Sequence, residues 1–170
     1  MGHRALVAYR RPDHLYDLRY SHWGADGLEL ADSLTRETPL ARGSVDADPL
    51  AETVALERVL SDYLDPCAHE AFYLVTERFE VSAYRVLWLE WGDGREEGRG
   101  ALVRVDPGPD DLAVRTWFRA TKTVLGDVVE MGVLSRRAAQ SYLEARVCED
   151  EDGYVYTYGG PHGQNTAESW

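Results

Sequence analysis

Lysine, cysteine and long apolar runs are scarce in this chain of 170 residues. It contains one lysine, Lys122, and two cysteines, Cys67 and Cys148. Two cysteines exclude the disulfide framework of a small secreted domain. No apolar run approaches the roughly 18 residues that a membrane helix needs, and the short apolar run within residues 1–10 ends at charged residues, unlike a signal peptide. We therefore expect a cytoplasmic protein with no membrane partner.

The charge of the chain is strongly one-sided. Acidic residues number 30 against 18 basic ones, a formal net charge of −12, and every basic residue except Lys122 is an arginine. The hydrophobic share of 44% excludes a disordered protein. Self-repulsion between like charges is screened at molar salt, where the Debye length falls to about 3 Å. The negative charge and the scarcity of lysine together predict a high-salt cytoplasm, although an acidic protein from an arginine-rich genome would share both features.

The order of the predicted elements indicates a single α+β domain over residues 1–158, followed by a disordered tail over residues 159–170. We expect a mainly antiparallel sheet of about five or six strands, packed on one face by about three helices. The strands are predicted over residues 4–10, 15–23, 71–79, 82–91, 101–105 and 154–158. The helices are predicted over residues 28–34, 48–64, 110–131 and 135–147, the last with Ser135 as its N-cap.

The first two strands form a predicted hairpin around Arg11-Pro12-Asp13-His14. Proline and aspartate suit the centre of a type I turn, so a four-residue loop is expected. That loop would place Arg10 opposite Leu15 and His3 opposite His22. The more apolar face of the hairpin would then meet the core, with these side chains: His3, Ala5, Val7, Tyr9, Tyr16, Leu18, Tyr20 and His22.

Two segments near the start of the chain carry a resemblance to a known family. Residues 1–9 read Met-Gly-His-Arg-Ala-Leu-Val-Ala-Tyr, and residues 15–25 read Leu-Tyr-Asp-Leu-Arg-Tyr-Ser-His-Trp-Gly-Ala. They resemble a haloarchaeal family of uncharacterised proteins, and the resemblance extends over most of the chain. It implies a halophilic archaeal source, in agreement with the charge, and it implies no activity.

The predicted His3–His22 pair is the first candidate for a catalytic site. Two neighbouring imidazoles on one face could bind a divalent metal or share a proton. Cys67, His69 and Glu70 could add ligands if the fold brings them close. No second Cys/His pair stands at the spacing of a structural zinc site. The alternative is that both histidines form ordinary hydrogen bonds at the edge of the sheet.

The last two predicted helices offer a candidate nucleic-acid surface. Arg115, Arg119 and Lys122 follow one another at helical spacing and could neutralise phosphates. Arg136 and Arg137 begin the next helix after a turn that resembles that of a helix-turn-helix. However, the first helix is long for that motif and the chain is acidic, so a helical hairpin capped by Ser135 explains the same residues.

These observations favour a non-enzymatic cytosolic binding or regulatory protein. A small metal-assisted hydrolase that uses His3 and His22 is the first alternative, and a DNA-binding regulator that uses the hairpin around Ser135 is the second. The sequence predicts no cofactor, does not favour nucleic acid as a partner, and leaves open both enzymatic activity and homo-oligomer formation. The tryptophans expected in the core are Trp23, Trp88, Trp91 and Trp117.

Overall fold

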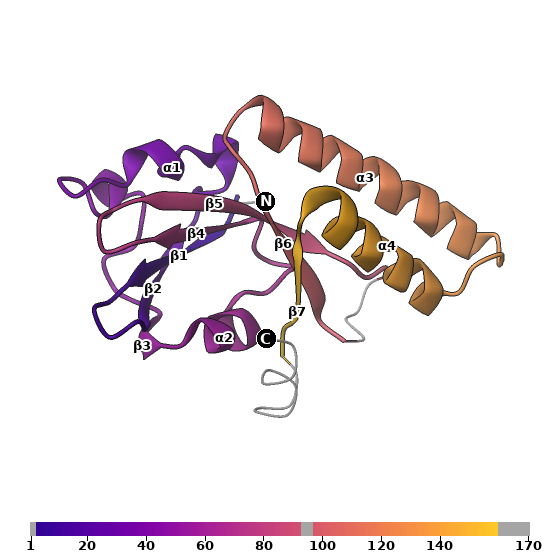
Figure 1. The fold of residues 1–170 in the computed structure, drawn as a ribbon, viewed down its shortest axis with the longest axis horizontal. Coiled ribbons are helices and arrows are strands. Elements are labelled where there is room, and N and C mark those ends of the chain that lie inside the picture. Colours follow the sequence, from indigo (N-terminus) through magenta and orange to yellow (C-terminus); the bar gives the residue numbers. More distant parts are fainter. Residues whose placement is uncertain (1–2, 93–96, 160–170) are drawn as a thin grey trace.

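The computed structural model describes residues 3–92 and 97–159, and this part of the chain contains one sheet of seven strands. The strands lie side by side in the order β3-β2-β1-β4-β5-β6-β7 and curl into half of a barrel (Figure 1). In chain order the strands are β1 (Ala5–Arg10), β2 (Tyr16–Ser21), β3 (Ala51–Val54), β4 (Ala71–Val75), β5 (Val81–Trp88), β6 (Arg99–Arg104) and β7 (Tyr154–Thr157). The predicted α+β class and mainly antiparallel sheet are confirmed. Except for Gly159, the predicted tail lies outside the described residues.

The sheet contains one parallel pair, β1 beside β4. Parallel neighbours cannot be joined by a tight turn and need a long crossover. Here the crossover contains β2, β3 and a helical segment made of α2 (Leu56–Arg58) and a π-helical turn, η3 (Val59–Tyr63). Because β1 and β4 run in the same direction, the residues that precede both strands meet at one end of the sheet.

Helices cover both faces of the sheet, so the prediction that they pack on one face is wrong. One face carries α1 (Leu30–Ser33), α3 (Pro109–Glu130) and α4 (Arg136–Glu151), whereas the helical segment around α2 lies against the other (Figure 1). Each face has its own apolar core. As a result, β1 is buried on both sides, and its residues Ala5 to Ala8 are inaccessible to solvent. Two short 3-10 turns, η1 (Asp26–Leu28) and η2 (Ala41–Gly43), flank α1 along the chain.

The long amphipathic helix and the helix after it agree with the sequence prediction. α3 spans Pro109–Glu130 and α4 spans Arg136–Glu151, and the Ser135 side chain accepts a hydrogen bond from the Ala138 amide at 3.1 Å. The apolar residues of α4 that face the sheet are fully buried: Ala139, Leu143 and Val147. No helix in the described part of the chain combines the length and the hydropathy of a membrane span.

The predicted helix over residues 48–64 is wrong in its first half. Residues Ala51–Val54 form β3, which pairs with β2, and the helical segment begins only at Leu56. The amide of Leu50 donates to the Leu18 carbonyl at 2.7 Å, so a strand partner far away in sequence takes the backbone groups that a helix would have used. Val59, Leu60 and Leu64 are buried, so the second half of the predicted segment does supply core residues.

The predicted register of the first hairpin is wrong by one residue. Arg10 lies opposite Tyr16 and Ala5 lies opposite Ser21, whereas the prediction placed Arg10 opposite Leu15. The Arg11 amide donates to the Leu15 carbonyl at 2.8 Å, and His14 adopts a left-handed backbone with φ of 67°. The loop is therefore a three-residue turn with a left-handed third residue. A slip of one residue moves side chains to the other face of the ribbon.

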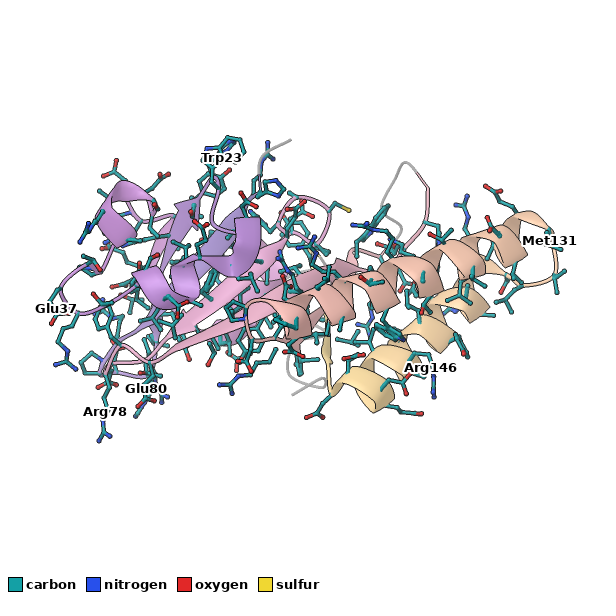
Figure 2. The ribbon with its side chains drawn as sticks, turned by 90° about the horizontal axis from the view of Figure 1, so that it is seen from above. Trp23, Glu37, Arg78, Glu80, Met131 and Arg146 are labelled. Carbon is teal, nitrogen blue, oxygen red and sulfur yellow. The ribbon has the colours of Figure 1, made fainter. Side chains whose placement is uncertain are left out.

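The expectation that the tryptophans lie in the core is corrected by the structure. Trp23 is 62% exposed rather than in the core, while Trp88, Trp91 and Trp117 are half-buried. Cys67 and Cys148 are both exposed at the surface. The molecule is elongated, and Figure 2 shows Arg78 and Glu80 near one end and Met131 at the other.

Candidate functional site

The corrected register separates His3 from His22. His3 lies on the same face of the sheet as Ala5 and Val7, which is the face that α3 covers. His22 lies on the opposite face, the one that carries Leu18. His3 Nδ1 lies 3.1 Å from Glu70 Oε2, and His22 Nδ1 lies 3.0 Å from the Tyr20 hydroxyl. The cross-strand histidine pair expected from the sequence is therefore not formed.

The other three metal-ligand candidates are divided between different neighbours. Glu70 joins His3, but His69 Nδ1 accepts a hydrogen bond from the Asp65 amide at 3.0 Å, and burial lowers the pKa of this histidine. The backbone amide of Cys67 donates to the Asp65 carboxylate at 2.9 Å. Among residues 3–92 and 97–159, no three His, Cys, Asp or Glu side chains lie close enough together to hold a metal ion.

A cavity of about 710 Å³ lies between α3 and the end of the sheet where β1 and β4 begin. Its walls come from the inner face of α3, the last half of β5 with Trp91 beyond it, the loop after β2, and the residues just before β1 and β4. His3 and Glu70 lie on the sheet side. On α3 the residues that face the cavity recur every three or four positions, as on one side of a helix.

Charge is arranged in order along the α3 wall of the cavity. Arg115, Arg119 and Lys122 line its N-terminal part, and Asp127 and Glu130 line its C-terminal part. The basic stripe that the sequence indicated is therefore present, and it faces this cavity. In a molecule with a net charge of −12, these three cations make the N-terminal part of the α3 wall positive and able to attract an anion, while the carboxylates of Asp26, Glu70, Asp127 and Glu130 line other parts of the cavity.

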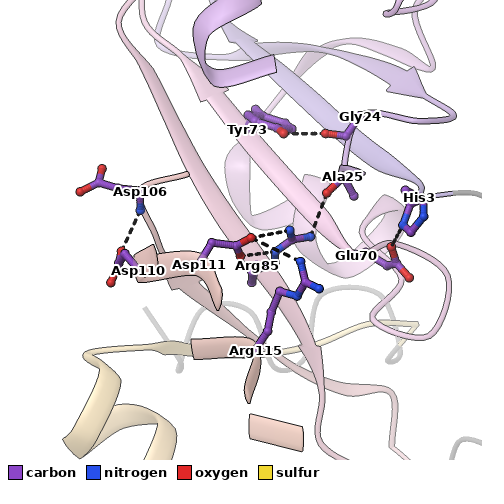
Figure 3. A network of polar contacts seen from close by, with 10 residues as sticks. All are labelled: His3, Gly24, Ala25, Glu70, Tyr73, Arg85, Asp106, Asp110, Asp111 and Arg115. Atoms are coloured by element: carbon purple, nitrogen blue, oxygen red, sulfur yellow. Dashed lines mark hydrogen bonds and ion pairs between the residues drawn. The ribbon is translucent and has the colours of Figure 1, made fainter. Parts of the chain in front are cut away.

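A buried ion pair anchors the beginning of α3 to the sheet at the edge of this cavity. Arg85 on β5 donates to Asp111 on α3 through two bonds, Nε to Oδ1 at 2.5 Å and Nη2 to Oδ2 at 2.8 Å (Figure 3). Its third donor reaches the Ala25 carbonyl at 3.1 Å. Arg115 approaches the same carboxylate, with Nη1 3.5 Å from Oδ2. Asp111 thus pairs with both Arg85 and Arg115, and Arg119, one helical turn further along α3, is the cavity guanidinium that does not share this carboxylate.

A second polar contact fixes the loop after β2. The hydroxyl of the buried Tyr73 donates to the Gly24 carbonyl at 2.5 Å, and burial raises the pKa of this phenol (Figure 3). Tyr73 and Arg85 thus hold consecutive carbonyls, those of Gly24 and Ala25, from β4 and β5. The loop wall of the cavity is therefore held by the sheet rather than by its own sequence.

The amine of Lys122, a residue of the cavity wall, is surrounded by aromatic rings. Its Nζ donates to the Trp88 carbonyl at 2.7 Å and lies 4.2 Å from the centroid of the Trp88 ring. The Trp91 and Phe118 rings are each 5.8 Å from the same nitrogen. Burial lowers the pKa of Lys122 to about 8, although the nearby Cys67 and Glu90 oppose this shift.

The backbone of α3 and the buried Glu90 together position the aromatic wall. Trp91 Nε1 donates to the Lys122 carbonyl at 3.2 Å and packs on Gly126, where a Cβ atom would stand only 3.1 Å from that nitrogen. The Glu90 carboxylate is 3% exposed and accepts hydrogen bonds from the amides of Glu97, Gly98 and Arg99. It also accepts from Trp88 Nε1 at 3.3 Å. The glycine within α3 is thus explained by the close approach of an indole.

The remaining nucleic-acid candidates lie apart from this cavity. Arg136 and Arg137 begin α4 and do not line it, and the Arg136 guanidinium lies near Gly92. Sequence reasoning found Arg115, Arg119 and Lys122 but missed the residues that complete the site: Arg85, Trp91, Asp111, Phe118, Asp127 and Glu130. One signal was available for Arg85, which is the one charged residue of β5 and needs a partner where that strand is buried.

The model of a family of unknown function (DUF6735) matches residues 1–44 and 41–155. No curated protein matches the chain, and no solved structure does.

Proposed function

The chain belongs to this family of unknown function (DUF6735), and we propose that it is a binding protein for a small anion with a flat apolar part. The main support for this proposal is the cavity of about 710 Å³, which has Arg115 and Arg119 on the same wall as Phe118. A volume of this size suits a small organic ligand rather than a single ion. Guanidinium groups bind carboxylates and phosphates through paired hydrogen bonds, and aromatic rings pack against flat ligand surfaces.

The electrostatics of the molecule support an anion rather than a cation. A cation would be attracted to almost any part of a surface with a net charge of −12, so selective binding of a cation would gain little from this cavity. An anion is repelled by most of the surface and is attracted where Arg119 and Arg115 are concentrated. The aromatic rings of Trp91 and Phe118 then add contact area beyond the charge.

Binding is tested with benzoate as the probe and benzamide as its uncharged counterpart, by ligand-detected NMR on the full chain. We expect benzoate to bind and benzamide to bind more weakly. Arg119→Gln should weaken benzoate binding about tenfold or more, because a hydrogen bond to a charged group contributes about 1.5–3 kcal/mol.

Arg78→Gln is the matched control, because it removes the same charge at the end of the molecule opposite Met131 (Figure 2). The control should bind benzoate as the natural chain does. Equal binding of benzoate and benzamide, or equal losses in the Arg119 and Arg78 variants, would contradict the proposal.

We further propose that the protein works in the cytoplasm of a halophilic archaeon. The support is the net charge of −12, the presence of one lysine, and the resemblance of residues 1–25 to haloarchaeal proteins. Carboxylates keep a surface hydrated at high salt, and molar salt screens their mutual repulsion. Benzoate binding is therefore to be measured in potassium chloride at both low and high concentration.

A further inference from the structure

Lys122 is the only lysine in a chain that otherwise uses arginine, at 17 positions. Lys122 lines the cavity, and its amine is surrounded by the rings of Trp88, Trp91 and Phe118. An arginine would supply the positive charge equally well, but its guanidinium stays protonated and does not act as a nucleophile near neutral pH. The single side-chain primary amine of the sequence is thus partly buried, and it belongs to a residue that lines the cavity.

We propose that Lys122 is a carbonyl-reactive amine that holds an aldehyde or ketone ligand covalently as an imine. The ligand carries a carboxylate or a phosphate, which Arg119 and Arg115 bind. This inference rests on the proposed binding function of the same cavity and names the chemical class of its ligand.

The reaction needs no further reactant. The neutral Nζ adds to the carbonyl carbon: one C–N bond forms, the C=O π bond breaks, and one proton of the nitrogen passes to the oxygen to give a carbinolamine. The hydroxyl group then leaves together with the remaining nitrogen proton as water, and the C=N double bond forms. The reaction is reversible, and water restores the free amine and the carbonyl compound.

The surroundings of Lys122 favour the neutral amine that this addition requires. Burial lowers its pKa to about 8, so about a tenth of the amine is uncharged at pH 7, whereas a lysine in water is almost fully protonated. Cys67 and Glu90 act in the opposite direction, and Arg119 is the basic residue nearest in sequence on its own helix. A neutral amine can keep its hydrogen bond to the Trp88 carbonyl and still use its lone pair.

The spacing along α3 fits a ligand with two functional groups. Arg119 precedes Lys122 by about 4.5 Å along the helix axis and Arg115 precedes it by about 10.5 Å, at 1.5 Å per residue. A flat ring between the carbonyl and the anionic group would lie beside Phe118, which stands between the two arginines in the sequence and lines the same cavity.

The test uses 4-formylbenzoate with cyanoborohydride, which reduces an imine to a stable amine, followed by peptide mapping by mass spectrometry. Because the chain has one lysine, only Lys122 and the N-terminal amine can form a stable adduct. The N-terminal amine has an ordinary pKa of about 8, so it serves as an internal control of similar basicity. We expect 4-formylbenzoate to label Lys122 at least about tenfold faster than the N-terminus, because it is first held by Arg119.

Two comparisons separate this inference from the binding proposal. Benzaldehyde lacks the carboxylate and should lose the preference for Lys122, and Arg119→Gln should lose it for 4-formylbenzoate. Lys122→Arg should remove the lysine adduct, and the mapping of the natural chain stands without this variant if it does not fold. Labelling confined to the N-terminus while benzoate still binds would overturn the inference and leave the binding function standing. Labelling of Lys122 at equal rates by both aldehydes would overturn the anion-directed imine, and absence of both labelling and benzoate binding would overturn both proposals.

Discussion

At the scale of single residues, the cavity depends on the buried pair of Arg85 and Asp111. The two residues are 5% and 4% exposed, and together with the Ala25 carbonyl they connect β5, α3 and the loop after β2. An ion pair this deep does not have to increase stability by itself, because removing both charges from water is costly. Its effect is to fix the start of α3 at one position over the sheet, since any other position would leave a buried charge without its partner.

Asp111→Asn keeps the shape of the side chain and removes the charge opposite Arg85. We expect the free energy of unfolding to fall by about 3–5 kcal/mol, because a buried guanidinium is left uncompensated. Urea titration measures this loss. Glu149→Gln breaks the exposed contact with Arg146 on α4 and should cost less than about 1 kcal/mol. Equal losses in the two variants would show that the Arg85–Asp111 pair is not effectively buried.

At the scale of elements, the turn between β1 and β2 decides which residues face the cavity. His14 takes a left-handed conformation, which makes the loop one residue shorter than Arg11-Pro12-Asp13-His14 predicts. The pairing then places His3 across from Trp23, and the two rings are 6.3 Å apart. A four-residue loop would have brought His3 and His22 to the same face. One backbone angle at the turn therefore determines that His3 joins Glu70 and that His22 joins Tyr20.

His14→Gly and His14→Ala test the strain in this turn. Both variants lose the contact of His14 with Arg10, which is 2.7 Å long, so their difference isolates the backbone. A left-handed residue with a Cβ atom costs about 1–2 kcal/mol, whereas glycine adopts this conformation freely. We expect the glycine variant to be more stable than the alanine variant by about 1 kcal/mol in urea unfolding. Equal stabilities would mean that the turn in solution does not hold residue 14 in this conformation.

At the scale of the whole molecule, the charge determines how the protein responds to salt. A net charge of −12 on a chain of this size opposes the compact state, and the described ion pairs engage only some of the carboxylates. Exposed pairs weaken as salt rises, but the repulsion among the excess carboxylates is screened as well. Because acids outnumber bases by 12, the second effect should prevail.

The free energy of unfolding should therefore rise between about 0.1 M and 1 M potassium chloride. Urea titrations give this value without adding further charge, since urea is uncharged. Sodium chloride at equal ionic strength should give the same rise, because screening depends on ionic strength rather than on the cation. A stability that stays constant or falls with salt would contradict the proposed halophilic setting, and a difference between the two salts would indicate specific cation binding.

The sequence by itself determined the features that arise within one segment. Helical periodicity and the Ser135 cap defined α3 and α4, because both depend on neighbours along the chain. Composition defined the net charge, because that charge is a sum over residues and does not depend on the fold. The basic stripe Arg115–Arg119–Lys122 was visible from the same helical periodicity. The sequence did not show that this stripe lines a cavity, because the opposite wall of the cavity comes from β5 and the loop after β2.

Only the tertiary structure decided the features that depend on distant partners. β3 is a strand because β2 offers it hydrogen bonds, and the parallel contact of β1 with β4 brings His3 and Glu70 together. Local preference could not reveal these pairings, since the free energy of each one comes from groups far apart in the chain. The low pKa of Lys122 has the same origin, because water is excluded from its amine by residues of the sheet and of α3 together.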